Sequence, residues 1–278
     1  TLAEAIMCNG GAIHKMGSIE EGTTISDYRE YEIKNQHSIS LSLMNIEWLD
    51  KKFNILDTPG YLDFHGEVIS AMGVADFAAI VVSSLEGIDV GTEMCWDYAD
   101  KKFSIPKLFI INMADKDQSD FDSVLAALQS RYGRTVFPFT LPVNQGPNFN
   151  QIADVLRKEV FTFKADGSGN YTEAAAEGEW VQKLEGMHND LIELIAESDE
   201  SLLEIFFDKG ELSENELRSG LHQALKTGGL IPVFCVAGIT NIGVKRMMDI
   251  LAKYAPCAGD FEEVVGTKPG SDEEVIHG

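Results

Sequence analysis

The stretch FNILDTPGYLDF, residues 53–64, decides the fold of this chain. Residues 53–56 have the apolar character of a strand, which would end directly in Asp57, whereas the segment after Gly60 is polar and irregular. An aspartate at a strand tip can hold Mg²⁺, usually through water, and a glycine amide with no Cβ beside it can approach a terminal phosphate. The same residues are also compatible with an ordinary strand-to-turn connection, and this alternative stays open.

Strands and helices alternate on either side of the central acidic region. Residues 77–84 and 107–112 are continuous apolar runs, which are typical of strands buried on both faces. An amphipathic helix is predicted over 121–132, a further buried strand over 230–236 and a closing helix over 241–255. This alternation predicts an α/β domain with a mainly parallel sheet and helices on both of its faces.

An acidic block interrupts this predicted core. Residues 151–227 contain 17 acidic and 7 basic residues and are expected to be largely helical. The block is either a solvated helical face or an acidic docking surface, and the sequence leaves both open. We predict the first part of the core over 1–134, an inserted, mixed but largely helical subdomain over 135–229, the end of the core over 230–258, and a linker or tail over 259–278.

The composition limits the classes of partner. With 22 Lys and Arg against 45 Asp and Glu, the formal net charge of −23 opposes any broad electrostatic binding of DNA or RNA. No apolar run approaches the roughly 20 residues of a bilayer span, so we expect no membrane insertion. The four cysteines lack a CxxC pair, which favours free thiols in a reducing compartment. We expect a cytoplasmic monomer.

Two further predicted strands end in short runs that could read a base. The first ends in Asn112 to Asp115 and the second in Cys235 to Gly238. An aspartate carboxylate matches the two donors at N1 and N2 of guanine, and adenine has no equivalent pair. We expect Asn112 to brace the loops and the Gly238 amide to reach O6. Because ligands bind at the carboxyl ends of strands in open α/β sheets, the three strand tips predict one crevice.

The chain resembles the G domain of translational GTPases, most of all elongation factor G and its divergent paralogues. The likeness extends from Thr1 to about Pro256, and the acidic block is similar in position and size to the insert of elongation factor G. The resemblance implies a P-loop NTPase-like, Ras-like fold with GTP or GDP and Mg²⁺ as ligands. Four stretches carry it: residues 57–64, GIDVGTEMCW at 87–96, residues 112–115, and IPVFCVAGITNIGV at 231–244.

The resemblance also implies roles for individual residues. Asp57 would hold Mg²⁺ through water, and Ser38 would add a hydroxyl ligand at the position of a metal-binding threonine. Gly60 would sense the γ-phosphate, and Tyr61 would orient the attacking water. The expected nucleotide-contacting residues are Asp57, Thr58, Pro59, Gly60, Tyr61, Asn112, Met113, Ala114, Asp115, Ala237 and Gly238.

Besides Ser38, three residues depart from the pattern of the family. Tyr61 replaces the histidine that orients water; a phenol can still position water, but with a pKa of about 10 it cannot supply imidazolium charge. We therefore expect slower or differently triggered hydrolysis. Met113 replaces the lysine that covers the base, and Ala237 replaces a serine that supports the loop. Both are compatible with weaker guanine binding and with simple core filling.

The phosphate loop GxxxxGK[ST] does not occur in this sequence. Thr1 to Glu4 resembles the residues that follow that motif in the family, so we expect upstream residues in the natural protein that supply the loop and its preceding strand. The polypeptide without them is expected to bind nucleotide poorly and to be inactive as a GTPase.

The resemblance implies a translation factor that hydrolyses GTP on the ribosome to drive translocation or recycling. Its partners would be the ribosomal stalk protein and large-subunit RNA, reached mainly through domains outside this chain. One alternative is a degenerate nucleotide- or ribosome-binding module without efficient turnover. Another is a ribosomal protection or release-factor-like GTPase.

Overall fold

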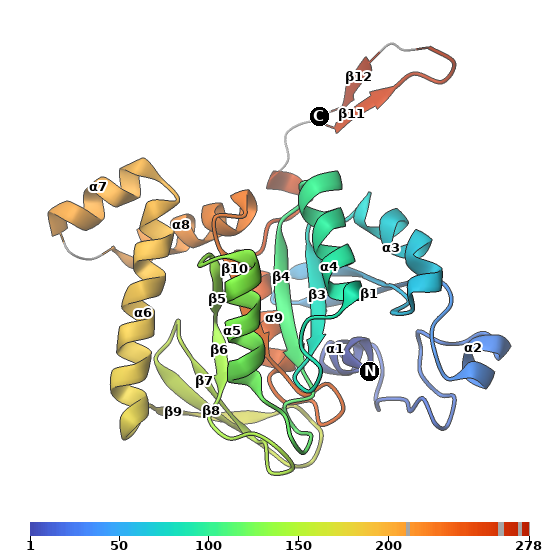
Figure 1. Ribbon diagram of the computed structural model, residues 1–278, viewed down its shortest axis with the longest axis horizontal. Helices are drawn as coiled ribbons and strands as arrows, with labels where there is room; N and C mark the ends of the chain where they lie inside the picture. Colours follow the sequence, from blue (N-terminus) through green and yellow to red (C-terminus); the bar gives the residue numbers. More distant parts are fainter. Residues whose placement is uncertain (210–211, 261–263, 272–273, 278) are drawn as a thin grey trace.

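A computed structural model of the chain describes residues 1–209, 212–260, 264–271 and 274–277, and its centre is a four-stranded parallel sheet (Figure 1). The strand order is β3-β4-β10-β5, and each neighbouring pair runs parallel. The strands are β3 (Ala78–Ser83), β4 (Lys107–Asn112), β10 (Ile231–Cys235) and β5 (Val136–Pro138). All five residues of β10 are buried, as expected for a central strand covered on both faces.

Helices α4 (Val90–Asp97) and α5 (Phe121–Tyr132) cover one face of this sheet (Figure 1). Their aromatic side chains meet over β4: the Trp96 ring stacks on Phe109 with a centroid distance of 5.7 Å and on Tyr132 at 4.1 Å. Both helices begin at an aspartate that accepts a hydrogen bond from a backbone amide, which satisfies a donor left free in the first turn. A short π-helix, Tyr98–Lys102, continues α4.

The other face of the sheet is covered by α1 (Leu2–Asn9) and α9 (Val244–Tyr254), which pack on each other and on a separate hairpin (Figure 1). The hairpin strands β1 (Ser42–Trp48) and β2 (Lys51–Asp57) pair antiparallel. Leu49 and Asp50 form the turn with positive φ angles of 47° and 59°, the conformation that suits a two-residue hairpin loop. Asp57 is therefore the last residue of a strand, as the sequence predicts.

The insert contains a second, antiparallel sheet in addition to helices. Its strand order is β6-β7-β8-β9, and it is followed by three helices. The first strand expected in the insert, β5, joins the parallel core sheet instead. The elements are β6 (Thr140–Pro142), β7 (Gln151–Asp154), β8 (Glu159–Phe163), β9 (Tyr171–Ala175), α6 (Glu179–Glu197), α7 (Glu200–Lys209) and α8 (Glu214–Thr227).

The expectation of a largely helical acidic block is therefore wrong for residues 151–175, which form three strands. The physical reason is visible in β8, where Phe161 and Phe163 alternate with more exposed residues and are buried. The Tyr171 ring lies across the strands from both, at centroid distances of 5.0 and 5.2 Å. Such cross-strand aromatic contacts stabilise a sheet more than local propensity opposes it.

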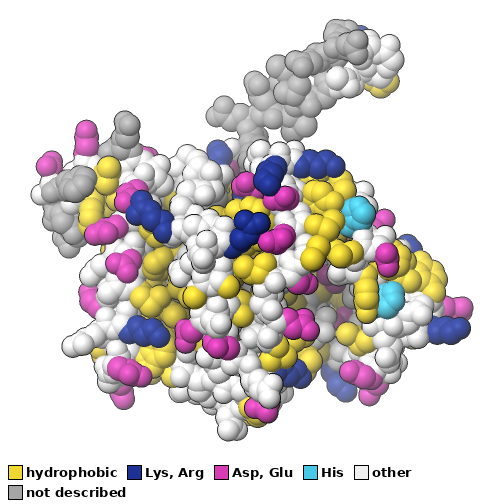
Figure 2. All heavy atoms as spheres, in the orientation of Figure 1, with side chains coloured by type: hydrophobic (Ala, Val, Ile, Leu, Met, Phe, Trp, Pro, Cys, Tyr) yellow, Lys and Arg dark blue, Asp and Glu magenta, His cyan; other side chains and the backbone are white. Residues whose placement is uncertain are grey.

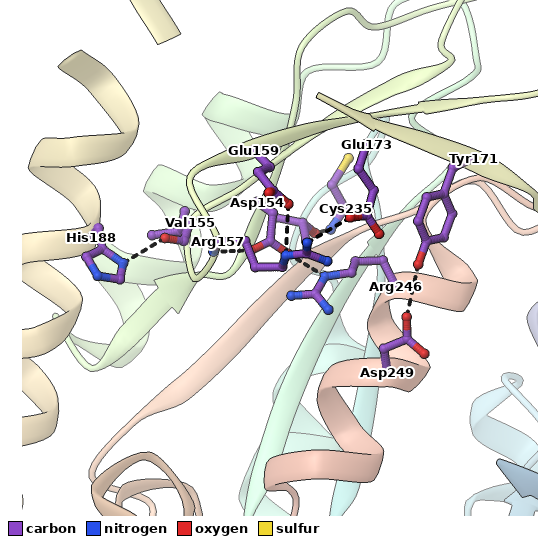
Figure 3. A network of polar contacts seen from close by, with 11 residues as sticks. Asp154, Val155, Arg157, Glu159, Tyr171, Glu173, His188, Cys235, Arg246 and Asp249 are labelled. Atoms are coloured by element: carbon purple, nitrogen blue, oxygen red, sulfur yellow. Dashed lines mark hydrogen bonds and ion pairs between the residues drawn. The ribbon is translucent and has the colours of Figure 1, made fainter. Parts of the chain in front are cut away.

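A buried polar junction joins the insert sheet to the core (Figure 3). Arg246 on α9 donates through Nε to Asp154 on β7 at 2.6 Å, and both side chains are almost fully buried, at 5% and 0% exposure. Asp249, one turn further along α9, accepts hydrogen bonds from the Tyr171 hydroxyl at 3.1 Å and from Trp48 Nε1 at 2.9 Å. Helix α9 thus holds the insert and the β1–β2 hairpin at once.

The remaining elements are short. They are α2 (Glu30–Asn35), a 3₁₀ turn at Leu62–Phe64, α3 (His65–Met72), a second 3₁₀ turn at Ala258–Asp260, β11 (Val264–Thr267) and β12 (Glu274–His277). Because β11 and β12 pair antiparallel, the segment 259–278 contains a hairpin that an irregular tail does not predict. Residues 261–263, 272–273 and 278 of that segment lie outside the described residues.

The surface shows no continuous cationic area on the face drawn in Figure 2, where dark blue Lys and Arg side chains are interspersed with magenta Asp and Glu. Within the described parts of the chain, no helix combines the length and apolar character needed to cross a bilayer. All four cysteines are free thiols.

Candidate functional site

The carboxyl ends of β4 and β10 bring two of the predicted loops together. Ile111 and Cys235 are paired across the two strands, so the residues that follow them lie at the same edge of the sheet. The Gly238 amide donates a hydrogen bond to Asn112 Oδ1 at 2.9 Å, and the Ala114 amide donates to the Val236 carbonyl at 3.3 Å. Asn112 therefore braces the two loops against each other.

The residues between these contacts differ in what their side chains can reach. Ala114 and Ala237 are fully buried, so only their backbone groups are available to a ligand. Met113 has a positive φ of 69° and an exposed side chain. Asp115 is half-buried beside it. Of these four residues, Asp115 and Met113 are the ones whose side chains can contact a base.

Asp57 lies in an acidic neighbourhood at the end of β2. Burial raises the pKa of its carboxyl group, and the carboxylates of Asp27 and Glu4 raise it further. Asp27 Oδ1 accepts a hydrogen bond from the Ser38 hydroxyl at 2.6 Å. Asp27 is thus close to both predicted metal-binding residues, Asp57 and Ser38.

This neighbourhood fits a hard divalent cation that is shared with a ligand. Mg²⁺ is usually bound by one or two carboxylates together with waters and substrate phosphates. Across the described ranges, no three His, Cys, Asp or Glu side chains are arranged to hold a metal by themselves. Asp57, whose ionised form is disfavoured by burial and by neighbouring carboxylates, would be relieved by a cation. The residues present therefore fit a Mg²⁺ ion completed by phosphate oxygens.

The loop after Asp57 is open at its tip. Thr58 is half-buried and Pro59 is buried, whereas Gly60 and Tyr61 are exposed. A Cβ built on Gly60 would meet no atom within 4 Å, so its backbone can be approached from outside. The Tyr61 side chain is 59% exposed and its ring packs on His37.

The first turn of α1 is close to both of these groups of residues. A Cβ on Gly238 would lie 3.3 Å from Leu2 Cα, so the β10 loop is in contact with the start of this helix. Glu4, in the same turn, is one of the carboxylates that raise the pKa of Asp57. Amide groups at a helix N-terminus favour anions, because they are unpaired and the helix dipole is positive there.

Comparison with known proteins follows this geometry. Residues 1–257 match the family described as the elongation factor Tu GTP binding domain. The chain belongs to this family. A crystal structure of a protein from Thermus thermophilus is also similar, with a TM-score of 0.87 and 28% sequence identity. That match covers 95% of this chain and 39% of the other, so this translational GTPase G domain spans about two fifths of that protein.

Several residues of this G domain that sequence reasoning missed are carboxylates that accept backbone amides. Glu4 accepts from Gly17 and Ile25 at 2.8 and 2.6 Å. Glu32 accepts from the Ile39 and Ser40 amides, and Glu67 accepts from the Leu41 amide. These contacts hold the segment that carries Ser38. The sequence offers no direct signal for them, because any residue except proline can supply the amide.

A search for a nucleotide site by cavity volume alone would not lead to the strand ends of the G domain. A groove of about 540 Å³ lies between α5 and α6 and is lined by residues that include Arg134, Phe137 and Glu197. It lies at the carboxyl end of α5, whereas the loop that leads from β4 enters α5 at its amino end. The candidate nucleotide site is therefore identified by its polar groups.

Proposed function

We propose that this G domain binds GTP and GDP together with Mg²⁺ and hydrolyses GTP as part of an elongation factor G-like protein acting on the ribosome. Its role would be translocation or recycling in the cytoplasm. The observation that supports this most is that the first turn of α1 contacts the β10 loop at Leu2 and carries Glu4, whose carboxylate raises the pKa of Asp57. The expected base-contacting and phosphate-contacting residues would then lie near one helix N-terminus, which favours anions.

Base recognition would rest on Asp115. Its half-buried carboxylate can accept hydrogen bonds from N1 and N2 of guanine, and a site built for such donors rejects bases that lack them. Asn112 and Gly238 would shape the loops through their 2.9 Å hydrogen bond, and Met113 would cover the base with an apolar, uncharged side chain.

The test of this role is nucleotide titration of the intact natural protein. We expect Asp115→Asn to weaken GTP binding about 100-fold or more, because an amide presents a donor to N1 or N2. The same change should improve binding of xanthosine triphosphate, whose carbonyl at C2 can accept from an amide. Equal GTP affinity of the two proteins would remove Asp115 from the site.

The phosphate end would use Asp57, Ser38 and Gly60. Asp57 would hold Mg²⁺ through water, Ser38 would contribute its hydroxyl, and the Gly60 amide would face the γ-phosphate. When bound, Mg²⁺ neutralises charge on the phosphate oxygens. Asp27, which accepts from the Ser38 hydroxyl at 2.6 Å, would orient that group.

Hydrolysis would depend on Tyr61 as the residue that orients water. Phosphoryl transfer through a loose transition state requires alignment of water more than removal of its proton, so a phenol is sufficient. We expect Tyr61→Phe to lower the single-turnover rate of ribosome-stimulated GTP hydrolysis about tenfold or more with little change in GTP affinity. Identical rates for the two proteins would exclude Tyr61 from the mechanism.

A second candidate is a nucleotide- or ribosome-binding module without efficient turnover. The observations that favour it are the exposed Tyr61 in place of histidine and the exposed Met113 in place of lysine. Tight GTP binding without ribosome-stimulated release of phosphate would support this candidate. A ribosomal protection or release-factor-like GTPase would share the site described above and differ in the step that it serves on the ribosome.

The ribosomal partners follow from the same proposal. The insert helices α6 to α8 would face the stalk protein, and large-subunit RNA would be contacted mainly through parts of the protein outside this chain. The block 151–227 has 17 acidic and 7 basic residues, so contact with an acidic stalk protein would need apolar or helix-mediated contacts.

A further inference from the structure

Residue 61 is a tyrosine where the family pattern has a histidine, and the structure brings an imidazole beside it from another segment. The ring centroids of His37 and Tyr61 are 4.6 Å apart with an interplanar angle of 48°. Phe64, in the turn after Tyr61, lies 6.2 Å from the same imidazole. His37 therefore contacts the loop that follows Asp57, although it belongs to a segment that precedes the whole β1–β2 hairpin.

His37 is held in place on both sides. Before it, α2 ends at Asn35 and is followed by Gln36, whose φ of 57° turns the chain sharply. After it, the Ile39 and Ser40 amides donate to Glu32 Oε1 at 3.1 and 3.0 Å. Glu32 is 1% exposed, and hydrogen bonds from backbone amides to a carboxylate are stronger than neutral ones.

A second contact ties the same segment to α3. The Leu41 amide donates to Glu67 Oε2 at 2.6 Å, and α3 begins at His65, shortly after Tyr61. The segment that carries His37 is thus attached to the helix that follows the Tyr61 loop as well as to α2. The imidazole occupies a defined position relative to both.

Tyr61 itself has few other restraints. Its side chain is 59% exposed, and its hydroxyl has no hydrogen-bond partner among the residues that the structure describes. His65, the other histidine nearby, has Nδ1 within 2.7 Å of the Leu62 carbonyl and is engaged locally. The orientation of the phenol ring therefore depends on its packing against His37.

We propose that His37 is a positioning residue for Tyr61, holding the phenol ring so that it can orient water for GTP hydrolysis. Aromatic pairs of this kind add a modest, geometry-dependent stabilisation beyond simple burial. The inference rests on the proposed function, because it assigns a role within the hydrolytic step. Ser38, the next residue, would contribute to the metal side while His37 acts on the water side.

The test is a double-mutant cycle in the intact natural protein, with single-turnover GTP hydrolysis on ribosomes as the readout. We expect His37→Ala to lower the rate about three- to tenfold without changing GTP affinity, and His37→Phe to retain most of the rate because it keeps a ring. In a Tyr61→Ala background, His37→Ala should have no further effect. An unchanged rate for His37→Ala, or an equal loss in both backgrounds, would overturn the proposal.

A measurement that is independent of turnover separates this inference from the proposed function. Hydrogen exchange of the amides in residues 58–64 should become about three- to tenfold faster in His37→Ala and stay unchanged in His37→Phe. His14→Ala, a change at an exposed histidine, serves as the matched control. Unchanged exchange in His37→Ala would contradict the positioning of Tyr61 by His37. Absence of GTP binding by the wild type would contradict the proposed function and with it the hydrolytic role of this pair, even if the exchange rates showed that His37 positions the Tyr61 loop.

Discussion

The junction between α9 and the insert differs from the strand-end loops in whether its charged side chains are paired with an opposite charge. At the junction, Asp154 is buried against the Arg246 guanidinium at 2.6 Å, so each charge has its partner within the chain. At the strand ends, Asp57 lies near Asp27 and Glu4, and its pKa is raised by burial and by those carboxylates. The junction therefore needs no further counter-charge, whereas the strand-end loops are suited to bind a cation.

The two regions also differ in exposure. The side chains of Arg246 and Asp154 are almost fully buried, and the Arg246 guanidinium also lies over the Phe161 ring at 5.4 Å. In the loops, Tyr61 and Met113 are exposed and Gly60 has open space beside it. A satisfied buried network makes a rigid attachment, while loops with few buried contacts can adjust to a ligand.

Breaking the buried ion pair should have the largest effect on stability. We expect Asp154→Ala to lower the free energy of unfolding by about 3–5 kcal/mol, because it leaves the Arg246 guanidinium buried without a counter-charge. Urea-induced unfolding of the intact protein, followed by tryptophan fluorescence, measures this. The control is Arg134→Ala, which removes an ion pair with Glu197 whose side chains are 75% and 41% exposed, and should cost about 0–1 kcal/mol.

A double variant sharpens the same point. Asp154→Leu combined with Arg246→Met should recover much of the stability that Asp154→Ala loses, because well-packed apolar residues often replace a buried ion pair without loss. If Asp154→Ala were no more destabilising than Arg134→Ala, the distinction between the two regions would not hold.

In the loop region, the expected change in stability is smaller. Asn112→Ala would leave the buried Gly238 amide without its acceptor, and we expect a loss of about 1–3 kcal/mol. Asn112→Asp keeps an oxygen at the same position and should retain most of the wild-type stability. Both values come from the same urea titration. Equal stability of the alanine and aspartate variants would show that the bracing hydrogen bond contributes little.

The weakest expected effect concerns alkaline pH at the junction. Burial, together with the neighbouring Asp249 carboxylate, raises the pKa of the Tyr171 hydroxyl to about 12. The ordinary pKa is about 10, so the protonated phenol contributes stability that is complete below about pH 10 and is lost as the pH rises through about 12. We expect Tyr171→Phe to remove this part of the slope of unfolding free energy against pH.

Trp48→Phe provides the control for that measurement. It removes the other hydrogen bond to Asp249 and leaves the phenol of Tyr171 in place, so the alkaline slope should persist. A wild-type protein with no loss of stability between about pH 10 and about pH 12 would mean that ionisation of Tyr171 is not coupled to folding.

The spacing of apolar residues along the sequence was sufficient to predict many strands and helices of the core. The apolar run 107–112 coincides with β4, the periodic pattern over 121–132 coincides with α5, and the strand before Asp57 ends at Asp57. These elements are predictable because the spacing of apolar residues along each segment shows which side chains are buried. Pattern failed for residues 151–175, where burial of Phe161 and Phe163 against Tyr171 comes from strands that pair with one another.

The amino-acid sequence by itself determined the parallel α/β core, the three strand tips and the identity of the side chains offered there. Only the tertiary structure decided that Asp27 is close to both Ser38 and Asp57, that His37 packs on Tyr61, and that α9 carries the insert through Arg246. The reason is physical: a period of about two or of about 3.6 residues reports burial along one segment, whereas these contacts join side chains distant in sequence. Such pairings are selected by chain packing and by the need to satisfy buried polar groups, which no single segment encodes.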